Sequence, residues 1–271
     1  MTTESLRLPG AAFDELAASY DASFTTTALG RWLRAAVWER LDARFTGRRR
    51  ILDIGCGTGE DAVHLASRGH EVVAADVSAP MLELAAEKAR RAGCAERVDL
   101  RRVPMERLAA ELAGERFDGV CSNFGAVNCA PQVDRLIAAI APLIEPGAPL
   151  VWVVMGRHVP WEWAWFLARG DRRRAFRRLS REGASWRGLR IAYPTPGQLA
   201  RAMRPHFRPD RRLALGLVLP PSYAARWLEH SPRTFALLAR LERAASGWQP
   251  LAGLADHYVL EATRSPEHGD A

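Results

Sequence analysis

Three glycines at alternate positions follow an apolar run in residues 51–60, Ile-Leu-Asp-Ile-Gly-Cys-Gly-Thr-Gly-Glu. Gly55, Gly57 and Gly59 permit backbone angles and close contacts that a Cβ atom would prevent. The run before them suits the end of a buried strand, and apolar residues at helical spacing come after them. A strand, a glycine turn and a helix N-terminus form a surface on which a nucleotide-like ligand lies against bare backbone. The stretch therefore predicts a cofactor site; a turn with a purely structural role is the alternative.

The spacing of the glycines distinguishes between cofactors. A dinucleotide-binding turn reads Gly-x-Gly-x-x-Gly, which would place its third glycine at position 60. That position holds Glu60, and the third glycine comes one residue earlier, at Gly59. An acid at a helix N-terminus suits the helix dipole but opposes a bound pyrophosphate. We therefore expect a cofactor other than a dinucleotide.

A second acid follows the next predicted strand. Residues 71–75, Glu-Val-Val-Ala-Ala, have the composition of a short buried strand, and Asp76 comes directly after it. This carboxylate lies about twenty residues beyond the glycines, which is the spacing of a ribose-binding acid in such folds. Ser78 is a good N-cap for a helix over residues 80–92. The pattern favours a ribose contact for Asp76; capping at the surface is the alternative.

Asp-x-Gly-x-Gly-x-Gly at residues 53–59, with the acid at Asp76, resembles the class I S-adenosylmethionine-dependent methyltransferases. The resemblance covers roughly residues 48–156. It implies an α/β, Rossmann-like sheet of seven strands in the order 3-2-1-4-5-7-6, with the last strand antiparallel. It also implies an N-terminal helical cap, helical lid insertions, S-adenosyl-L-methionine as cofactor and S-adenosyl-L-homocysteine as product.

The resemblance assigns roles residue by residue. Asp76 is expected to bind both ribose hydroxyls, and Val77 to pack on the adenine. The family usually places an adenine-binding acid after the third strand, where this sequence has Pro104. The contact is therefore expected from Met105 or Glu106. The full predicted cofactor set is Tyr20, Asp53, Gly55, Cys56, Gly57, Gly59, Asp76, Val77, Met81, Met105, Glu106, Ser122, Asn123 and Phe124.

Hydrophobic periodicity places the remaining elements around this motif. Helices are predicted over residues 11–18, 28–45, 134–144 and 195–205, and strands over residues 97–103, 116–122, 149–154, 211–219 and 256–263. The predicted organisation is a helical cap (1–47), the cofactor-binding core (48–156), an aromatic and arginine-rich helical lid (157–194), the rest of the core (195–264) with a helical insertion at 222–250, and a tail (265–271). Residues 1–10 and the tail are expected to be loose.

Candidates for substrate contact lie outside the glycine motif. In the resembling family a tyrosine such as Tyr20 often closes over the cofactor, and packing is its alternative role. Asn128 belongs to the loop after the fourth strand, where ligands collect in such sheets, although a loop asparagine more often binds its own backbone. His158, at the mouth of the lid, is the candidate general base. Trp161 and Trp163 are expected to bind an apolar acceptor or to form the core of the lid.

The net charge of +7 is almost entirely arginine, since Lys88 is the only lysine. An arginine-rich helix is predicted after the lid aromatics, and it carries Arg172, Arg173, Arg174, Arg177, Arg178 and Arg181. Three interpretations stay open: a solvated face, a dock for an anionic substrate or acidic carrier protein, or a membrane-surface stripe. The loop after the fourth strand lacks the Asn/Asp-Pro-Pro-Tyr/Phe signature of enzymes that methylate DNA bases, so a nucleic-acid partner is not favoured.

The four cysteines, Cys56, Cys94, Cys121 and Cys129, fall in or beside predicted core elements without metal-ligand spacing. They indicate a reduced, cytoplasmic protein, and no metal site is predicted. The sequence thus predicts an enzyme that transfers a methyl group to a bulky, partly apolar small molecule, such as a specialised metabolite or a lipid-like acceptor. The alternatives are a nucleic-acid methyltransferase and a protein that binds the cofactor without transferring its methyl group.

Overall fold

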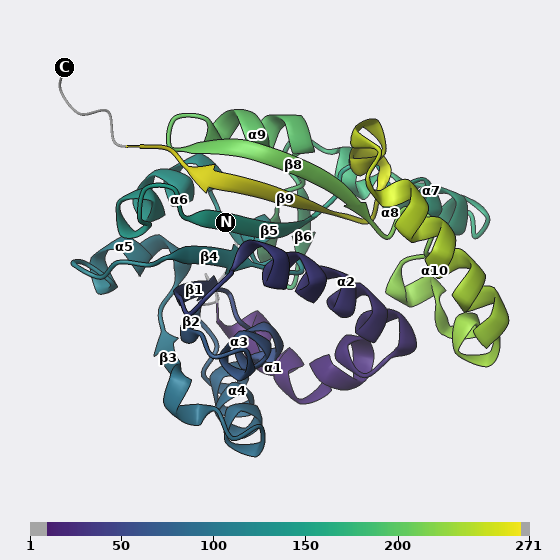
Figure 1. Cartoon of the computed structure of the whole chain (residues 1–271). Helices are drawn as coiled ribbons and strands as arrows, with labels where there is room; N and C mark the ends of the chain where they lie inside the picture. Colours follow the sequence, from purple (N-terminus) through teal and green to yellow (C-terminus); the bar gives the residue numbers. More distant parts are fainter. Residues whose placement is uncertain (1–9, 267–271) are drawn as a thin grey trace, which may run out of the picture.

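Parallel strands with short, apolar sequences build the centre of the molecule, which the computed structural model describes over residues 10–266 (Figure 1). The sheet consists of β1 (Arg50–Ile54), β2 (Glu71–Asp76), β3 (Val98–Arg102), β4 (Gly119–Ser122), β5 (Pro149–Met155), β8 (Phe207–Leu215) and β9 (His257–Arg264). Its order is β3-β2-β1-β4-β5-β9-β8. The first five strands pair in parallel, and β9 runs antiparallel to both β5 and β8. The predicted strand order and the antiparallel last strand are confirmed.

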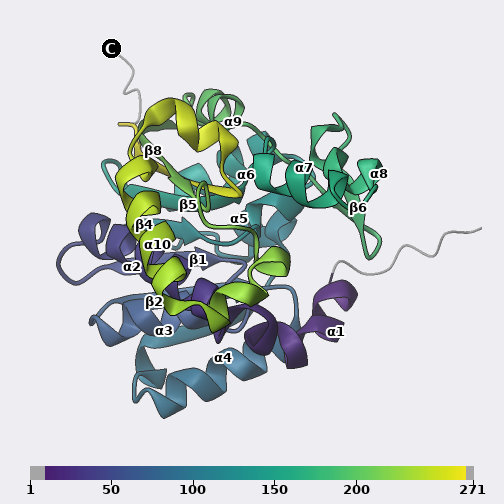
Figure 2. The same cartoon turned by 90° about the vertical axis from the view of Figure 1, so that its right-hand side faces the viewer.

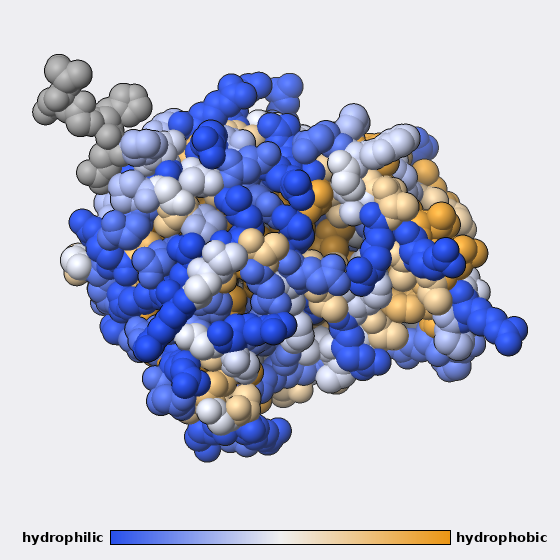
Figure 3. Space-filling view, viewed as in Figure 1, coloured by the Kyte–Doolittle hydropathy of each residue, from blue (hydrophilic) through white to orange (hydrophobic). Residues whose placement is uncertain are grey.

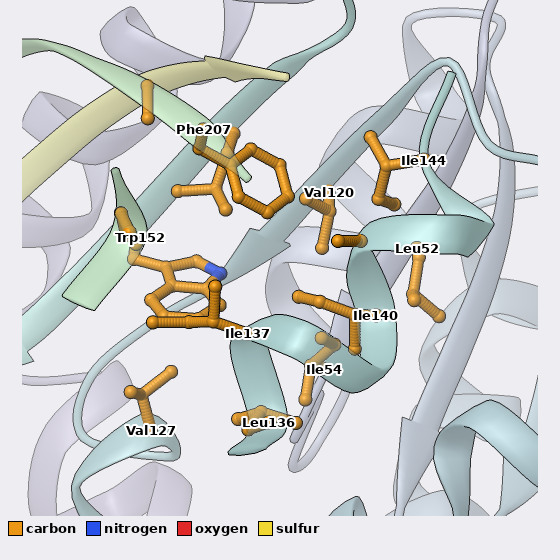
Figure 4. Packing of buried hydrophobic residues seen from close by; sticks show 14 of the residues in the cluster. Leu52, Ile54, Val120, Val127, Leu136, Ile137, Ile140, Ile144, Trp152 and Phe207 are labelled. Carbon is orange, nitrogen blue, oxygen red and sulfur yellow. The ribbon is translucent and has the colours of Figure 1, made fainter. Parts of the chain in front are cut away.

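Side chains of alternating residues along these strands enter two separate cores, because successive residues of a strand point to opposite faces. Leu52 and Ile54 pack in one core, whereas Ile51 packs in the other. The first core lies under α5 (Leu108–Glu111), α6 (Val133–Ile140) and α9 (Pro196–Met203), and the second under α2 (Ala28–Arg44), α3 (Glu60–Ser67) and α4 (Ala79–Arg91). Figure 4 shows Trp152 of β5 packed beside Ile137 of α6 in the first core. Helices on both faces bury the sheet, as the near-continuous apolar strands require.

The N-terminal cap is held against the core by the only lysine in the chain. Helix α1 (Ala11–Tyr20) continues into one π-helical turn, Asp21–Thr25. Lys88 of α4 lies 2.6 Å from the Asp21 carboxylate and 2.6 Å from that of Glu60. Asp21 also accepts a hydrogen bond from the Thr58 hydroxyl at 2.8 Å. These contacts fix the cap, and Tyr20 with it, beside the glycine turn.

The lid differs in part from its prediction. Helix α7 (Pro160–Leu167) is present, but the arginine-rich helix is only one turn, α8 (Arg172–Ala175), followed by a 3-10 turn over Arg177–Leu179. Like charges at helical spacing repel one another, and within the 3-10 turn Arg178 points inward to two buried acids. A hairpin of β6 (Ala184–Trp186) and β7 (Leu189–Ile191) then completes the lid.

Two C-terminal boundaries are corrected by the structure. Strand β8 begins at Phe207, not residue 211, because Pro209 is tolerated on an edge strand with a register shift beside it. It ends at Leu215, not residue 219. The predicted helical insertion consists of 3-10 turns at Ser222–Ala224 and Arg226–His230, followed by α10 (Pro232–Ser246). The loose arm and tail predicted at the two ends fall outside the described residues, apart from Gly10 and residues 265–266.

Helix α10 packs through one face only. Its buried Glu242 accepts hydrogen bonds from four consecutive backbone N–H groups, residues 216–219, at 2.7–3.0 Å. These bonds turn the chain away from the sheet where β8 ends. Leu237 and Leu241 on the opposite face are exposed, and Figure 3 shows apolar surface at the end of the molecule where α10 lies. No helix within residues 10–266 combines the length and apolarity needed to cross a bilayer.

Candidate functional site

A cavity of about 500 Å³ opens at the carboxyl ends of the parallel strands, beneath the cap and the lid. The loops after β1, β2, β3 and β4 form its floor, α1 one wall, and the β6–β7 hairpin another. Figure 2 shows α1 and β6 on the same side of the molecule. This is the edge at which ligands bind in open α/β sheets.

The glycine turn leaves bare backbone facing this cavity. Gly55, Gly57 and Gly59 all have positive φ, at 70°, 54° and 78°. A Cβ on Gly59 would lie 2.6 Å from the Cβ of Ala85, so Gly59 is needed for the close packing of α4. A Cβ on Gly57 would meet no protein atom within 4 Å, although Gly57 lines the cavity. The open space above Gly57 is therefore space for a ligand.

Asp76 is fixed at the end of β2 by backbone groups on both sides. One of its oxygens accepts from the Gly57 N–H at 2.9 Å and the other from the Ser78 N–H at 2.9 Å. Burial raises the pKa of this carboxyl group, although the N–H groups of Ser78 and Gly57 oppose that shift. Each oxygen keeps a further lone pair, so a carboxylate in this setting can accept hydroxyl protons from a ribose.

A buried ion pair lies behind the turn and was not predicted. The Arg34 guanidinium lies 3.0 Å from Asp61, which also accepts from the Trp38 indole at 2.7 Å. Asn123 donates to the same carboxylate at 3.0 Å. The Nε of Arg34 and the Oδ1 of Asn123 are buried without a hydrogen-bond partner among the described residues. Because Asn123 lines the cavity, its free oxygen suits a ligand's ammonium group.

The cap and the lid meet over the cavity. The rings of Phe13 in α1 and Trp186 in β6 lie 5.8 Å apart between centroids. Arg187 in the hairpin turn forms an ion pair with Glu15 of α1 at 2.7 Å. The hairpin turn has positive φ at Arg187 and Gly188, 49° and 83°, which is the twist that joins two short antiparallel strands through two residues. These contacts hold an apolar roof above the glycine turn.

The lid is joined to the core by a buried cluster of charges. Arg178 lies 2.8 Å from Glu162 of α7 and 2.8 Å from Asp256 before β9. Arg177 and the Tyr223 hydroxyl both donate to Glu162 at 3.1 Å. Burial alone would raise the pKa of Asp256, but the nearby positive charge, mainly that of Arg178, holds it well below its usual range. The cluster fixes Arg177 and Arg178 at the cavity wall.

Several ionisable groups in the cavity stay protonated at neutral pH. Burial raises the pKa of Tyr20, against the opposing charge of Arg34. Burial also raises the pKa of Tyr193 and raises that of the Cys129 thiol to about 12. These side chains can donate hydrogen bonds to a ligand, but none is suited to accept a proton as a general base.

Ten of the predicted site residues line this cavity: Tyr20, Gly55, Gly57, Asp76, Val77, Met81, Met105, Glu106, Asn123 and Phe124. Pro104, in the place of the family's acid, lines it together with Met105 and Glu106. Asp53, Cys56, Gly59 and Ser122 support the floor from outside. Asp53 is buried, and the Ser122 hydroxyl donates to the carbonyl oxygen of Ile54 at 2.7 Å.

The predicted catalytic and substrate residues lie elsewhere, apart from Tyr20. Asn128 is fully buried, and its amide donates to the carbonyls of Met155 and Ala192 at 3.2 and 2.6 Å and accepts from the Met155 N–H at 2.8 Å. Trp161 donates to the carbonyl oxygen of Val218 at 3.0 Å. His158 and Trp163 pack on each other, with ring centroids 6.4 Å apart. None of these four lines the cavity, so their geometry supports structural roles.

Most of the cavity lining that comes from the cap and the lid was not predicted from the sequence. Its residues come from α1, the end of β5 and the lid hairpin: Phe13, Leu16, Met155, Arg177, Arg178, Ala184, Ser185, Trp186, Leu189, Ile191 and Tyr193. The hairpin gave little signal, because its strands have only three residues each and Arg187-Gly188 is not one of the residue pairs typical of such turns. Arg34 offered no signal, because it occurs within an apolar helical stripe.

The strand order, the glycine turn and the acid at the end of β2 define a class I methyltransferase fold. Solved structures agree: the chain superposes on the cyclase SpnF with a TM-score of 0.61 and 21% identity, covering 95% of this chain and 94% of that one. It superposes on the N-methyltransferase NodS from Bradyrhizobium japonicum, in complex with S-adenosyl-L-homocysteine, with a TM-score of 0.59 and 14% identity, covering 96% and 99%.

Sequence comparison finds a methyltransferase domain in the core of the chain. Residues 51–147 match the family model of a methyltransferase domain. The demethylmenaquinone methyltransferase of Thermus thermophilus is 34% identical over 144 residues, which cover 51% of this chain and 62% of that protein. The chain thus carries a methyltransferase domain at residues 51–147, within the fold of the class I S-adenosylmethionine-dependent methyltransferases. It spans about half to three-fifths of the length of the first curated relatives that it matches.

The residues present fit the cofactor of this family, S-adenosylmethionine. Gly57 leaves room above the turn, Asp76 offers acceptor oxygens, and Asn123 has a buried oxygen without a partner. Val77 and Met105 line the same cavity with apolar surface, where an adenine ring can be buried. When bound, the cofactor supplies an electrophilic methyl group on a sulfonium sulfur.

Proposed function

We propose that the protein transfers the methyl group of S-adenosylmethionine to a bulky, partly apolar small molecule. The observation that carries this proposal is the continuity of one cavity from the glycine turn to the lid hairpin. Gly57 and Asp76 lie at one end, and Trp186, Leu189 and Ile191 at the other. A cofactor and an apolar acceptor can therefore share one space between the glycine turn, the cap and the lid.

The chain's own residues then act by binding and orientation. Asp76, Asn123 and the backbone of the turn would hold the cofactor, and the Phe13–Trp186 roof would hold the acceptor. Alignment of two reactants within one site is worth effective molarities on the order of 10⁵–10⁸ M. Tyr20 would donate a hydrogen bond within the cavity, because burial keeps its phenol protonated.

The lining of the cavity bears on the kind of acceptor atom. Among the described residues, no histidine lines the cavity, and its buried tyrosines and its cysteine thiol have raised pKa values. The two carboxylates of the lining, Asp76 and Glu106, belong to the predicted cofactor set. We therefore favour an acceptor that attacks through a lone pair or an already ionised atom. His158, the predicted base, lies outside, so His158→Ala is expected to leave transfer intact.

The test is product formation. The protein is incubated with methyl-labelled S-adenosylmethionine and a panel of apolar amines, phenolates and carboxylates, and label in the organic phase is counted. Asp76→Asn serves as the binding-deficient control. Transfer to at least one acceptor, lost in the control, supports the proposal. Cofactor binding without transfer to any acceptor would favour a non-methylating role, which is relevant because the structural neighbour SpnF is a cyclase.

A further inference from the structure

The positive charge of this protein is concentrated in its lid. Residues 157–194 contain ten arginines and no lysine, against the three acids Glu162, Asp171 and Glu182, which is a surplus of seven positive charges. The whole chain has a net charge of +7, so the rest of the molecule is balanced. A surplus of positive charge in one short segment points to a partner that binds there, because charge that served only solubility could be spread over the whole surface.

Part of this surplus converges on a second hollow beside the apolar cavity. The hollow has a volume of about 720 Å³ and is lined by Asp171, Arg173, Arg174, Arg177, Gly183, Ala184, Ser185 and Trp186. We call it the arginine vestibule. Arg177 and residues 184–186 line both spaces. Figure 2 shows α8 beside β6, the two elements between which the vestibule lies. The two hollows therefore share a wall, and an acceptor that occupied both would pass beside Arg177.

The charges of the vestibule are not balanced from within. Arg174 pairs with Asp171 at 3.4 Å, and Arg177 shares Glu162 with Arg178. Arg173 is exposed and has no acidic partner among residues 10–266. Arginine is the side chain best suited to carboxylates and phosphates, because its planar guanidinium donates two parallel hydrogen bonds. The vestibule thus retains positive charge for an anionic group.

We propose that the acceptor is an anionic amphiphile, with an apolar body in the cavity and a phosphate or carboxylate group in the arginine vestibule. This inference rests on the proposed function, since it names the class of acceptor for the same site. The apolar body would lie against Trp186, Leu189 and Ile191, and the acidic end would be held by Arg173, Arg174 and Arg177. The anion would thus fix which end of the acceptor faces the cofactor.

The probes are octyl phosphate, octanoate and 1-octanol, titrated calorimetrically into protein saturated with S-adenosyl-L-homocysteine. We expect octyl phosphate to bind roughly tenfold or more tightly than 1-octanol, since hydrogen bonds between charged groups are the strong ones. Arg173→Gln and Arg174→Gln should each weaken octyl phosphate roughly three- to tenfold without changing 1-octanol. Arg172→Gln is the matched control, because Arg172 lies in the same helical turn but lines neither space.

The comparison of the two anionic probes identifies the acidic group of the acceptor. Tighter binding of octyl phosphate indicates a phosphate, and tighter binding of octanoate indicates a carboxylate. Equal binding of all three probes, or an equal effect of Arg172→Gln and Arg173→Gln, would overturn the inference. RNA oligonucleotides that displace octyl phosphate, and that bind more tightly as their length increases, would overturn the inference in favour of a nucleic-acid partner. Each variant is also titrated with S-adenosyl-L-homocysteine alone, so a failure of the cofactor site is seen separately.

Discussion

Replacing Gly57 by alanine separates cofactor binding from folding. The new Cβ meets no protein atom within 4 Å, so its cost to folding comes only from the positive φ of 54°. A left-handed residue with a Cβ costs about 1–2 kcal/mol, and the reduced freedom of the unfolded chain offsets about 0.4–1 kcal/mol. The net loss of stability is therefore about 1 kcal/mol.

The cost to cofactor binding should be larger, because the added methyl group fills the space above the turn. An extra methyl in a close-packed site costs about 1–3 kcal/mol, which corresponds to a roughly 5- to 150-fold weaker affinity. The assay is calorimetric titration with S-adenosyl-L-homocysteine, beside urea unfolding of the same samples.

Gly93 provides the matched control for this experiment. It has a φ of 66°, is exposed after α4, and also has no atom within 4 Å of its Cβ position. Gly93→Ala should lose similar stability and no affinity. Equal affinity of the Gly57→Ala and Gly93→Ala variants would refute the placement of the cofactor over the glycine turn.

Three further predictions concern ionisable groups. Because burial raises the pKa of Asp76, acidification should weaken cofactor binding at a pH above the ordinary aspartate value of about 3.9. The Asp76→Asn variant should bind the cofactor weakly at every pH. The stability of the unliganded protein should change in the opposite direction and fall as the pH rises through this raised pKa. Glu242→Gln should lower the free energy of unfolding by about 3–5 kcal/mol, since the amide can accept only part of the four N–H bonds; an unchanged urea midpoint would contradict this. Asp256→Asn should cost about 3 kcal/mol at pH 7 by removing a partner of the buried Arg178. Because the pKa of Asp256 is depressed, the difference in stability between the two proteins should be present above about pH 4 and be lost as the pH falls further. Urea titrations of both proteins at several pH values would measure this difference.

The floor of the site could be predicted because its signals are local. The glycine turn, Asp76 and the loop residues after β3 and β4 all come directly after apolar strands, and the ends of parallel strands meet at one edge. The position of Tyr20 at the cofactor site was implied by the family resemblance, and Tyr20 lines the cavity. The strand order was implied by the family resemblance and is confirmed.

The lid was harder because its chemistry depends on long-range contacts. Trp161 and Trp163 have the composition of a substrate pocket, yet they pack against the inserted segments and leave the cavity to Trp186. Arg178 belongs to an arginine run but is buried by Glu162 and Asp256, which lie 16 and 78 residues away in the chain. Asn128 fills its hydrogen bonds with backbone groups of β5 and the lid. No sequence periodicity reports such partners.

The most direct test of the account is calorimetry of the purified protein with S-adenosylmethionine, S-adenosyl-L-homocysteine and NAD in parallel. We expect micromolar binding of the first two, no binding of NAD, and loss of binding in Asp76→Ala. Binding of NAD with neither sulfur nucleoside would contradict the assignment of the cofactor, and with it the proposed methyl transfer.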